Sequence, residues 1–309
     1  MSGSFLRAGV LAWILVGLGS VCQGQPSAIF PFQLPWDDRS ATVTDLSFLN
    51  PKPAGEQGNV RVGADGHLYS GDRRIRFLGV NFTNQACFPQ HTDAELIAGR
   101  LAKFGVNVVR FHLMDADWGT SSIFGPSGPG TRTLDAGALD RLDYFVARLK
   151  ENGIYSDINL LTGRNFSSAD GVDPAIDSMD WKAKQTPALF DPALIALQKE
   201  YASQLLGHLN PYTDLTYSRD PAVAFVEIVN EHGLLHAWQA GLIDDLPAYF
   251  AEELQAAWNG FLVERYGTQA NLSDHWTQTT DPGPQMLQNP NFSAGLQGWT
   301  VEQHDPARA

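Results

Sequence analysis

The fold of this chain is constrained most by short apolar runs that alternate with amphipathic segments, four times in succession. The apolar runs have the length of strands and contain many β-branched and aromatic residues, which is typical of strands covered on both faces in a parallel sheet. They occupy residues 77–82, 107–113, 154–161 and 222–231. The amphipathic segments after them have a helical period and occupy residues 94–104, 135–152, 192–209 and 246–265. This order predicts an α/β fold with right-handed crossovers.

Local signals support two of the helix starts. Thr92, followed by Glu95, predicts a capping box at the first helix. Asp191-Pro192 predicts the start of the third helix, with proline at its first position. Residues 81–84 lack a Gly-x-Gly-x-x-Gly pattern after the first strand, which disfavours a dinucleotide-binding fold. The alternation by itself fits both a doubly wound sheet and a barrel.

The N-terminal segment has the pattern of a secretory signal peptide over residues 1–24. Arg7 precedes an apolar core at residues 8–21, and small residues follow near Gly24. The core is short for a membrane span, so an uncleaved anchor is the weaker alternative. We therefore expect a secreted or periplasmic protein with no membrane contact after cleavage. Loss of Cys22 with the signal leaves Cys87 without an internal disulfide partner, so we expect Cys87 to be a buried, inert thiol.

Charge restricts the class of partner. The formal net charge is −13 over 309 residues. Nucleic acids and anionic membranes both require basic patches, so neither is an expected partner, whereas neutral sugars are compatible with this charge. His232 and His236 have the spacing of a zinc pair, but the glutamate of His-Glu-x-x-His is absent and no third ligand is evident. No metal or cofactor is expected.

Polar residues at the ends of the apolar runs are the candidate functional residues. Asn230-Glu231 ends the last run, and an amide and a carboxylate are costly to bury without partners. The simplest placement is at the C-terminal ends of the strands, where α/β barrels carry their chemistry. Glu231 could then act as a general acid or base, and Asn230 could bind a hydroxyl group. Arg110 and His112 alternate with apolar residues and share one face, where Arg110 requires a carboxylate partner.

Further candidates lie near the other strand ends. Asn81 ends the first predicted strand and Asn159 lies near the end of the third. Trp118, in a long loop, could stack on a sugar ring or pack within the loop. Asp115 and Asp117 in the same loop are interpreted most simply as solvated, with substrate contact as the alternative.

These residues resemble a known family. A strand that ends in Asn230-Glu231, an earlier one that ends in Val-Val-Arg110-Phe, and the sequence at 77–81 are similar to retaining (β/α)8-barrel glycosidases, in particular the cellulase-like glycoside hydrolase family 5. The resemblance covers about residues 60–275. It implies that Glu231 is the general acid/base, that Asn230 binds the substrate 2-hydroxyl, and that Arg110 holds the nucleophile carboxylate. It also implies a carbohydrate partner, with Trp118, His112, Asn81 and Asn159 as substrate-binding candidates.

The chain departs from this family in two respects. The family's nucleophile ends the seventh strand, whereas four strand–helix units are found here, so we expect the N-terminal half of a barrel whose C-terminal half is missing and which is inactive alone. A histidine that the family often has near the third strand end is replaced by Leu161. The alternative function is a non-catalytic carbohydrate-binding or scaffold protein on a degenerate barrel.

The resemblance completes the predicted domain organisation. The Pro- and Gly-rich segment resembles a linker, and the aromatic-flanked turn after it resembles the first strands of a β-sandwich. The expected domains are a signal peptide at 1–24, an extended lead-in and β-hairpin at 25–76, a partial glycosidase domain at 77–278, a linker at 279–290 and the start of a truncated carbohydrate-binding module at 291–309.

Overall fold

The computed structural model describes residues 35–118, 122–125, 130–277, 288–289 and 291–300. The predicted signal peptide and most of the predicted linker lie outside these residues. The central element is a parallel sheet of four strands in the order β4-β5-β6-β9. Its strands are β4 (Gly79–Thr83), β5 (Val108–His112), β6 (Tyr155–Leu161) and β9 (Val223–Val229). The chain therefore has the expected α/β fold with a parallel sheet.

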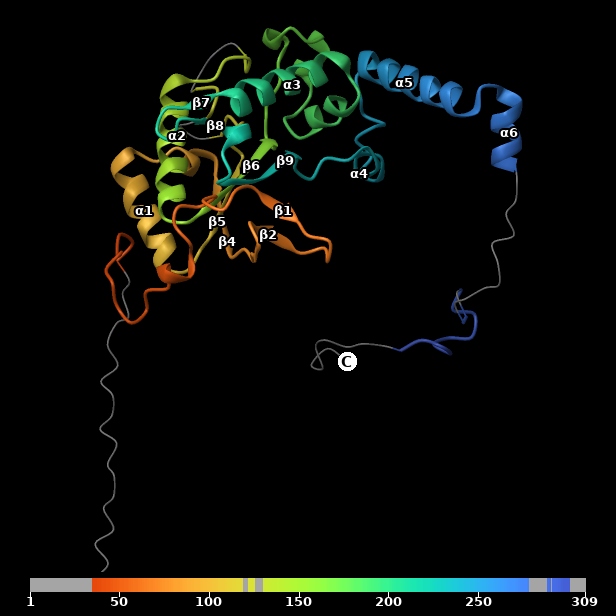
Figure 1. The fold of residues 1–309 in the computed structure, drawn as a ribbon. Coiled ribbons are helices and arrows are strands. Elements are labelled where there is room, and N and C mark those ends of the chain that lie inside the picture. Colours follow the sequence, from red (N-terminus) through yellow and green to blue (C-terminus); the bar gives the residue numbers. More distant parts are fainter. Residues whose placement is uncertain (1–34, 119–121, 126–129, 278–287, 290, 301–309) are drawn as a thin grey trace, which may run out of the picture.

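Helices connect successive strands and cover one face of the sheet (Figure 1). The connecting helices are α1 (His91–Lys103), α2 (Ala136–Glu151) and α3 (Pro192–Gly207), and α4 (Leu234–Gln239), α5 (Ala248–Tyr266) and α6 (Gln269–Thr277) follow the last strand. Short 3-10 helices occupy the loops: η1 (Ser47–Leu49), η2 (Asn84–Cys87), η3 (Ser168–Asp170), η4 (Pro174–Ser178), η5 (Ala183–Gln185), η6 (Pro187–Leu189) and η7 (Tyr217–Arg219). None of the helices in the described ranges is both long and apolar enough to cross a membrane.

Of the two helix starts predicted from local capping signals, the one at Asp191-Pro192 is confirmed and the one at Thr92 is wrong. The Asp191 side chain accepts a hydrogen bond from the backbone N–H of Leu194 at 2.8 Å and caps α3, with Pro192 at its first position. The capping box predicted for α1 is wrong, because α1 begins earlier, at His91, and has no side-chain cap. The Glu95 carboxylate instead accepts from the Tyr144 hydroxyl of α2 at 2.6 Å, so a tertiary contact replaces the local one.

The main core lies between the helices and the covered face of the sheet. Alternate residues of β4, β5 and β6 enter it, because side chains alternate between the two faces of a strand. Val109, Phe111 and Ile158 are fully buried there, and Phe145 of α2 contacts Phe111 edge to face at 5.7 Å between ring centres. The Cys87 thiol is buried in this core, and burial raises its pKa, which fits an inert side chain.

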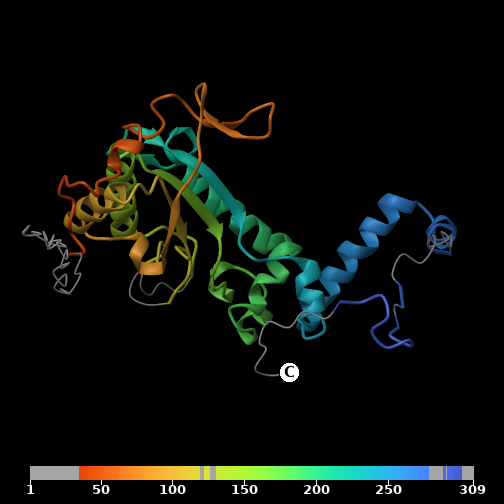
Figure 2. The ribbon, with the colours of Figure 1, turned by 90° about the horizontal axis from the view of Figure 1, so that it is seen from below.

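Strand β9 departs from the expectation of burial on both faces. It is an edge strand of the described sheet. Its outer face is the one on the same side of the sheet as the helices, where Val226 is paired with the buried Ile158. On this face Val226 is 40% exposed and Ile228 is 74% exposed. The helix α5, which would be expected to cover this face, buries Phe250 at its start and then extends away from the sheet, as Figures 1 and 2 show. Its outer residues Trp258 and Val263 are consequently exposed.

A small antiparallel sheet lies at the N-terminal end of the parallel strands. It contains β1 (Val60–Val62), β2 (Leu68–Ser70) and β3 (Arg73–Arg74) in that order. Beside it, Phe77 contacts the rings of Tyr155 and Phe225 edge to face at 5.6 and 5.2 Å between centres. These aromatic side chains close the lower end of the face that the helices leave open. A short pair that the sequence did not predict follows α3: β7 (Leu209–Asn210) and β8 (Leu215–Thr216).

The C-terminal residues form a compact turn structure. The ring of Trp299 stacks on Phe292 at 5.0 Å, and its Nε1–H donates to the carbonyl oxygen of Asn289 at 3.0 Å. Residues 301–309 lie outside the described part of the chain, so the predicted β-sandwich start stays a prediction.

Candidate active site

The candidate site occupies the face of the parallel sheet opposite the helices, which we call the open face. Parallel strands place paired residues on the same side, so the register determines which side chains meet there. Arg110 is paired with Asn81 on one side and with Asp157 on the other, and Asn159 is paired with Glu227. The open face therefore carries a row of polar and charged side chains. In a sheet that closes into a barrel, this face would line the interior of the barrel.

An ion pair between Arg110 and Glu227 is the centre of the open face. Arg110 Nε donates to Glu227 Oε1 and Nη2 donates to Oε2, both at 2.6 Å, which is a bidentate arrangement. Arg110 Nη2 also donates to Asn230 Oδ1 at 3.0 Å. The carboxylate that Arg110 requires is therefore supplied from within β9, four residues before Glu231.

Glu227 was missed in the sequence because it lies inside an apolar run. The signal was nevertheless present. A carboxylate in the middle of a buried strand requires a cationic partner. Arg110 is a positively charged residue within another of the apolar runs. What the sequence did not provide is the register that places these two residues, 117 positions apart, side by side.

Two other predicted residues join this network. His112 Nδ1 lies 2.9 Å from Asn159 Oδ1 and 3.3 Å from Arg110 Nη1. Because the amide oxygen accepts and the guanidinium donates, His112 Nδ1 can bond to one of them at a time, according to its tautomer. Arg110, His112, Asn159 and Asn230 are thus brought together as one hydrogen-bonded set around Glu227.

Glu231 lies just beyond the end of β9 and outside this set. Its φ is +53°, in the left-handed region, and its side chain is exposed. Asn84 after β4 and Leu113 after β5 have the same left-handed backbone, at +52° and +56°. Such values are uncommon for residues other than glycine and cost energy that the surrounding structure must offset. The chain therefore turns sharply at the C-terminal ends of three of the four strands.

The charges on the open face shift one another's pKa values. The hydrogen bond from Arg110 lowers the pKa of Glu227 to about 2, so Glu227 is ionised. Burial, together with a hydrogen bond to Glu227, raises the pKa of Asp157 to about 7. The Glu227 hydrogen bond raises the pKa of Arg110, with a smaller contribution from the charge of Glu231. Burial lowers the pKa of His232 to about 4, so this ring is neutral at pH 7.

Two tryptophan side chains from the loops after β5 and β6 contact each other. Trp118, which is 37% exposed, contacts the ring of Trp181 edge to face at 4.4 Å between centres. The Lys182 ammonium lies 5.6 Å from the centre of the Trp181 ring. Lys182 also lines a small crevice together with Glu231 and His232. Trp181 was not among the predicted site residues. Asn81 is on the open face but exposed.

The expectation that Asp115 is solvated is wrong. Asp115 is 2% exposed, and its carboxylate accepts backbone hydrogen bonds from Thr162, Gly163 and Arg164 at 2.9–3.1 Å. The hydroxyl of Thr162 donates to it as well. Asp115 thereby ties the loop after β5 to the loop after β6. Its neighbour Asp117 is exposed, as expected.

The Arg110–Glu227 pair gives a testable stability effect. Replacing Arg110 by methionine leaves Glu227 beside Asp157 without a cation, and we expect the free energy of unfolding to fall by about 2 kcal/mol. This value lies between those of exposed and fully buried pairs, because both side chains are a quarter to a third exposed. Urea unfolding measures the loss. The double variant R110M/E227Q should recover part of it, and equal losses in the single and double variants would contradict this coupling.

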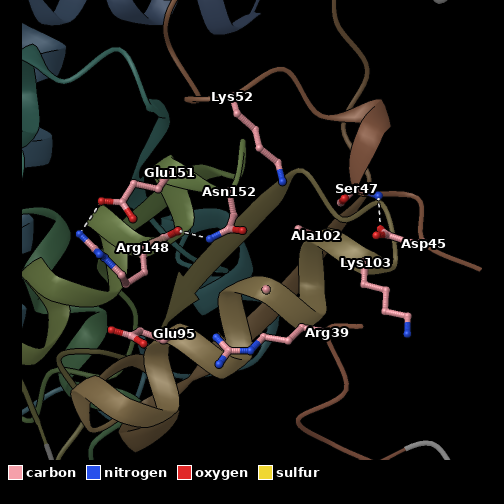
Figure 3. Close-up of a pocket in the computed structure, with 11 residues that line it drawn as sticks. Arg39, Asp45, Ser47, Lys52, Glu95, Ala102, Lys103, Arg148, Glu151 and Asn152 are labelled. Atoms are coloured by element: carbon pink, nitrogen blue, oxygen red, sulfur yellow. Dashed lines mark hydrogen bonds and ion pairs between the residues drawn. The ribbon is translucent and has the colours of Figure 1, made fainter. Parts of the chain in front are cut away.

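Two cavities lie away from the Arg110–Glu227 pair. The larger, of about 540 Å³, is lined by residues such as Arg74, Asn107 and Tyr155. The one drawn in Figure 3, of about 380 Å³, lies between α1 and α2 on the helical side of the molecule. Its lining mixes Arg39, Lys52 and Arg148 with acidic side chains such as Glu95. It shares no residue with the open face. Within the described ranges there is no group of three or more His, Cys, Asp or Glu side chains that could hold a metal ion.

Comparison with known proteins gives structural likenesses only. No protein-family description matches the chain, and no curated protein matches it. Among solved structures, it is similar to the endo-1,4-β-mannanase of Rhizomucor miehei (17% identity, TM-score 0.46), covering 57% of this chain and 49% of that one. It is also similar to a glycoside hydrolase family 5 mannosidase of that organism (18%, 0.44, 57% and 49%) and to the endo-β-1,4-mannanase of Thermotoga petrophila (20%, 0.39, 57% and 41%). The chain spans two-fifths to one-half of the length of these structures.

Proposed function

We propose that this chain carries the acid/base half of the active site of a glycoside hydrolase that cleaves β-linked sugars with retention. The observation that carries the proposal is the arrangement of Arg110, Asn230 and Glu231 at the C-terminal ends of parallel strands. Arg110 is anchored by Glu227 and holds the amide oxygen of Asn230. Glu231, one residue later, is exposed just beyond the C-terminal end of β9.

The anchored amide suggests how a sugar would be held. Asn230 Oδ1 accepts from Arg110, so the amide NH₂ group is turned away from the guanidinium and can donate to a hydroxyl of the substrate. Glu231 would protonate the glycosidic oxygen as the bond breaks. It would then remove a proton from water as the covalent intermediate is hydrolysed.

Retention needs a second carboxylate about 5–5.5 Å from the first. Glu227 is a poor candidate, because both of its carboxylate oxygens accept hydrogen bonds from Arg110. We infer that the nucleophile comes from further strands that continue the sheet at β9. Within the described residues β9 is an edge strand, and Val226 and Ile228 on its outer face are exposed, which supports this proposal. This chain alone is then expected to show no turnover.

Two assignments from the sequence complete the proposal. We propose export through the N-terminal signal peptide, which suits an enzyme that acts on an external polysaccharide. We also propose that the turn around Phe292 and Trp299 begins a carbohydrate-binding module. Both rest on the sequence pattern.

Sugar binding to this chain tests the proposal. Trp118 is exposed and contacts Trp181, whose neighbour Lys182 lines a crevice with Glu231. Loss of one aromatic contact costs about 0.5–1.5 kcal/mol. We expect β-linked mannan or glucan oligosaccharides to quench tryptophan fluorescence and W118A to weaken binding about tenfold. Trp258, exposed on α5 far from the open face, is the matched control, and W258A should bind like the parent. Equal binding by W118A and the parent would contradict this sugar site.

A non-catalytic binding protein is the second candidate. It is favoured by one observation, namely that the two strand carboxylates of the described sheet are already engaged: Glu227 is bonded to Arg110, and Asp157 interacts with Glu227. The two candidates differ in one measurement. A protein that contains this chain with a completed sheet turns over β-glycosides in the first case and only binds them in the second.

A further inference from the structure

The open face holds one more carboxylate than its cation can bind. Arg110 is paired in register with Asp157, yet its guanidinium bonds to Glu227 and Asn230 instead. Asp157 Oδ1 is buried and accepts no hydrogen bond from a donor group of the described residues. Two carboxylates thus share the surroundings of a single guanidinium, and one of them is in direct contact with it.

The groups around Asp157 do not supply a second cation. The charged side chains that act on Asp157 are Arg110 of β5 and Glu227 of β9. Its other neighbours on the open face are His112 of β5 and the uncharged Asn81, Tyr155 and Phe225. His112 turns its Nδ1 to Asn159 and Arg110 rather than to Asp157. A carboxylate that is half-buried beside another and lacks its own donor is most stable when it holds a proton.

We propose that Asp157 is a neutral carboxylic acid that donates its proton to Glu227 and thereby acts as a positioning residue for the Arg110–Asn230 pair. The proton removes the repulsion between the two carboxyl groups, so Glu227 keeps both oxygens on Arg110. Arg110 then holds the Asn230 amide in one orientation. The relevance to catalysis rests on the proposed function, whereas the shared proton does not.

The shared proton gives stability an unusual dependence on pH. The pKa of Asp157 is about 7 in the folded chain and 3.8 ordinarily, so the folded state retains a proton that the unfolded state has lost. The contribution of Asp157 to the free energy of unfolding therefore falls as pH rises from about 4 to about 7. Glu227, lowered to about 2 from 4.5, contributes the opposite change, which is complete by about pH 5.

Carbon-13 NMR of the side-chain carboxyl groups tests the shared proton directly in the unaltered chain. We expect the Asp157 carboxyl carbon to titrate near pH 7, and the Arg110 Nε signal to shift over the same range as the guanidinium is redistributed. A titration of Asp157 near pH 4 would overturn the proposal. The measurement requires no substrate, so its outcome is independent of whether the chain binds sugars.

Urea unfolding of D157N gives a second test. Asparagine imitates the neutral acid, so the variant should lose the fall in stability between pH 5 and 7 that the parent shows. D117N, an exposed carboxylate that contacts Asn165, is the control and should keep the parental slope. An unchanged slope in D157N would contradict the proposal. In a catalytically complete protein, D157N should also shift the alkaline limb of the kcat profile, which a purely structural role would not move.

Discussion

Replacing Glu231 by glutamine is expected to abolish hydrolysis of unactivated β-glycosides, with a loss of at least about 10³-fold in kcat, in a protein that contains this chain and a completed sheet. The reason is that glutamine cannot donate a proton to the leaving oxygen, and general acid–base catalysis contributes about 10²–10⁴-fold in each step that uses it. Substrate binding should change little, because glutamine keeps the size and the hydrogen-bonding capacity of the side chain.

Substrates with different leaving groups distinguish a role of Glu231 as general acid from a general loss of structure. An aryl glycoside with an acidic phenol needs little protonation, so its bond cleavage should be affected much less than that of an oligosaccharide. E227Q, four residues earlier and within β9, is the matched comparison. It should alter stability and the Arg110 geometry and should not show this dependence on the leaving group. Full activity of E231Q on oligosaccharides would exclude Glu231 as the acid/base.

Replacing Asp115 by alanine is expected to cost about 3 kcal/mol of unfolding free energy. The carboxylate accepts three backbone hydrogen bonds and one from a hydroxyl in a fully buried position. Alanine leaves these donors unsatisfied, and each buried unsatisfied donor costs about 1–3 kcal/mol before the loops relax. Thermal unfolding measures the loss, and the loops after β5 and β6 should become more susceptible to proteolysis.

The neighbouring acid provides the control for this prediction. Asp117 lies two residues away in the same loop, is exposed, and accepts one side-chain hydrogen bond from Asn165. D117A should therefore change stability by less than about 0.5 kcal/mol. D115N should fall between the two alanine variants, because it keeps one acceptor oxygen. Similar stabilities for D115A and D117A would contradict the structural role of Asp115.

The contrast between these two aspartates shows where sequence reasoning ended. Both residues lie in a polar loop and look alike in the sequence. The donors of Asp115 are the backbone amides of residues 162–164, which belong to a loop nearly fifty positions away. The same limit applied to Thr92 and Glu95. Their local capping signal was overridden because a Tyr144 hydroxyl from α2 bonds to Glu95.

The sequence by itself determined the order of strands and helices, since apolar periodicity and helix stop signals are local properties. It also located Arg110, His112, Asn159 and Asn230, because polar residues at strand ends stand out from apolar runs. Only the tertiary structure decided that Glu227 is the partner of Arg110 and that Asp157 is paired with Arg110 in the sheet. It also decided that the outer face of β9, with Val226 and Ile228, is exposed. These features depend on register and on helix placement, which are set by contacts between residues far apart in the chain.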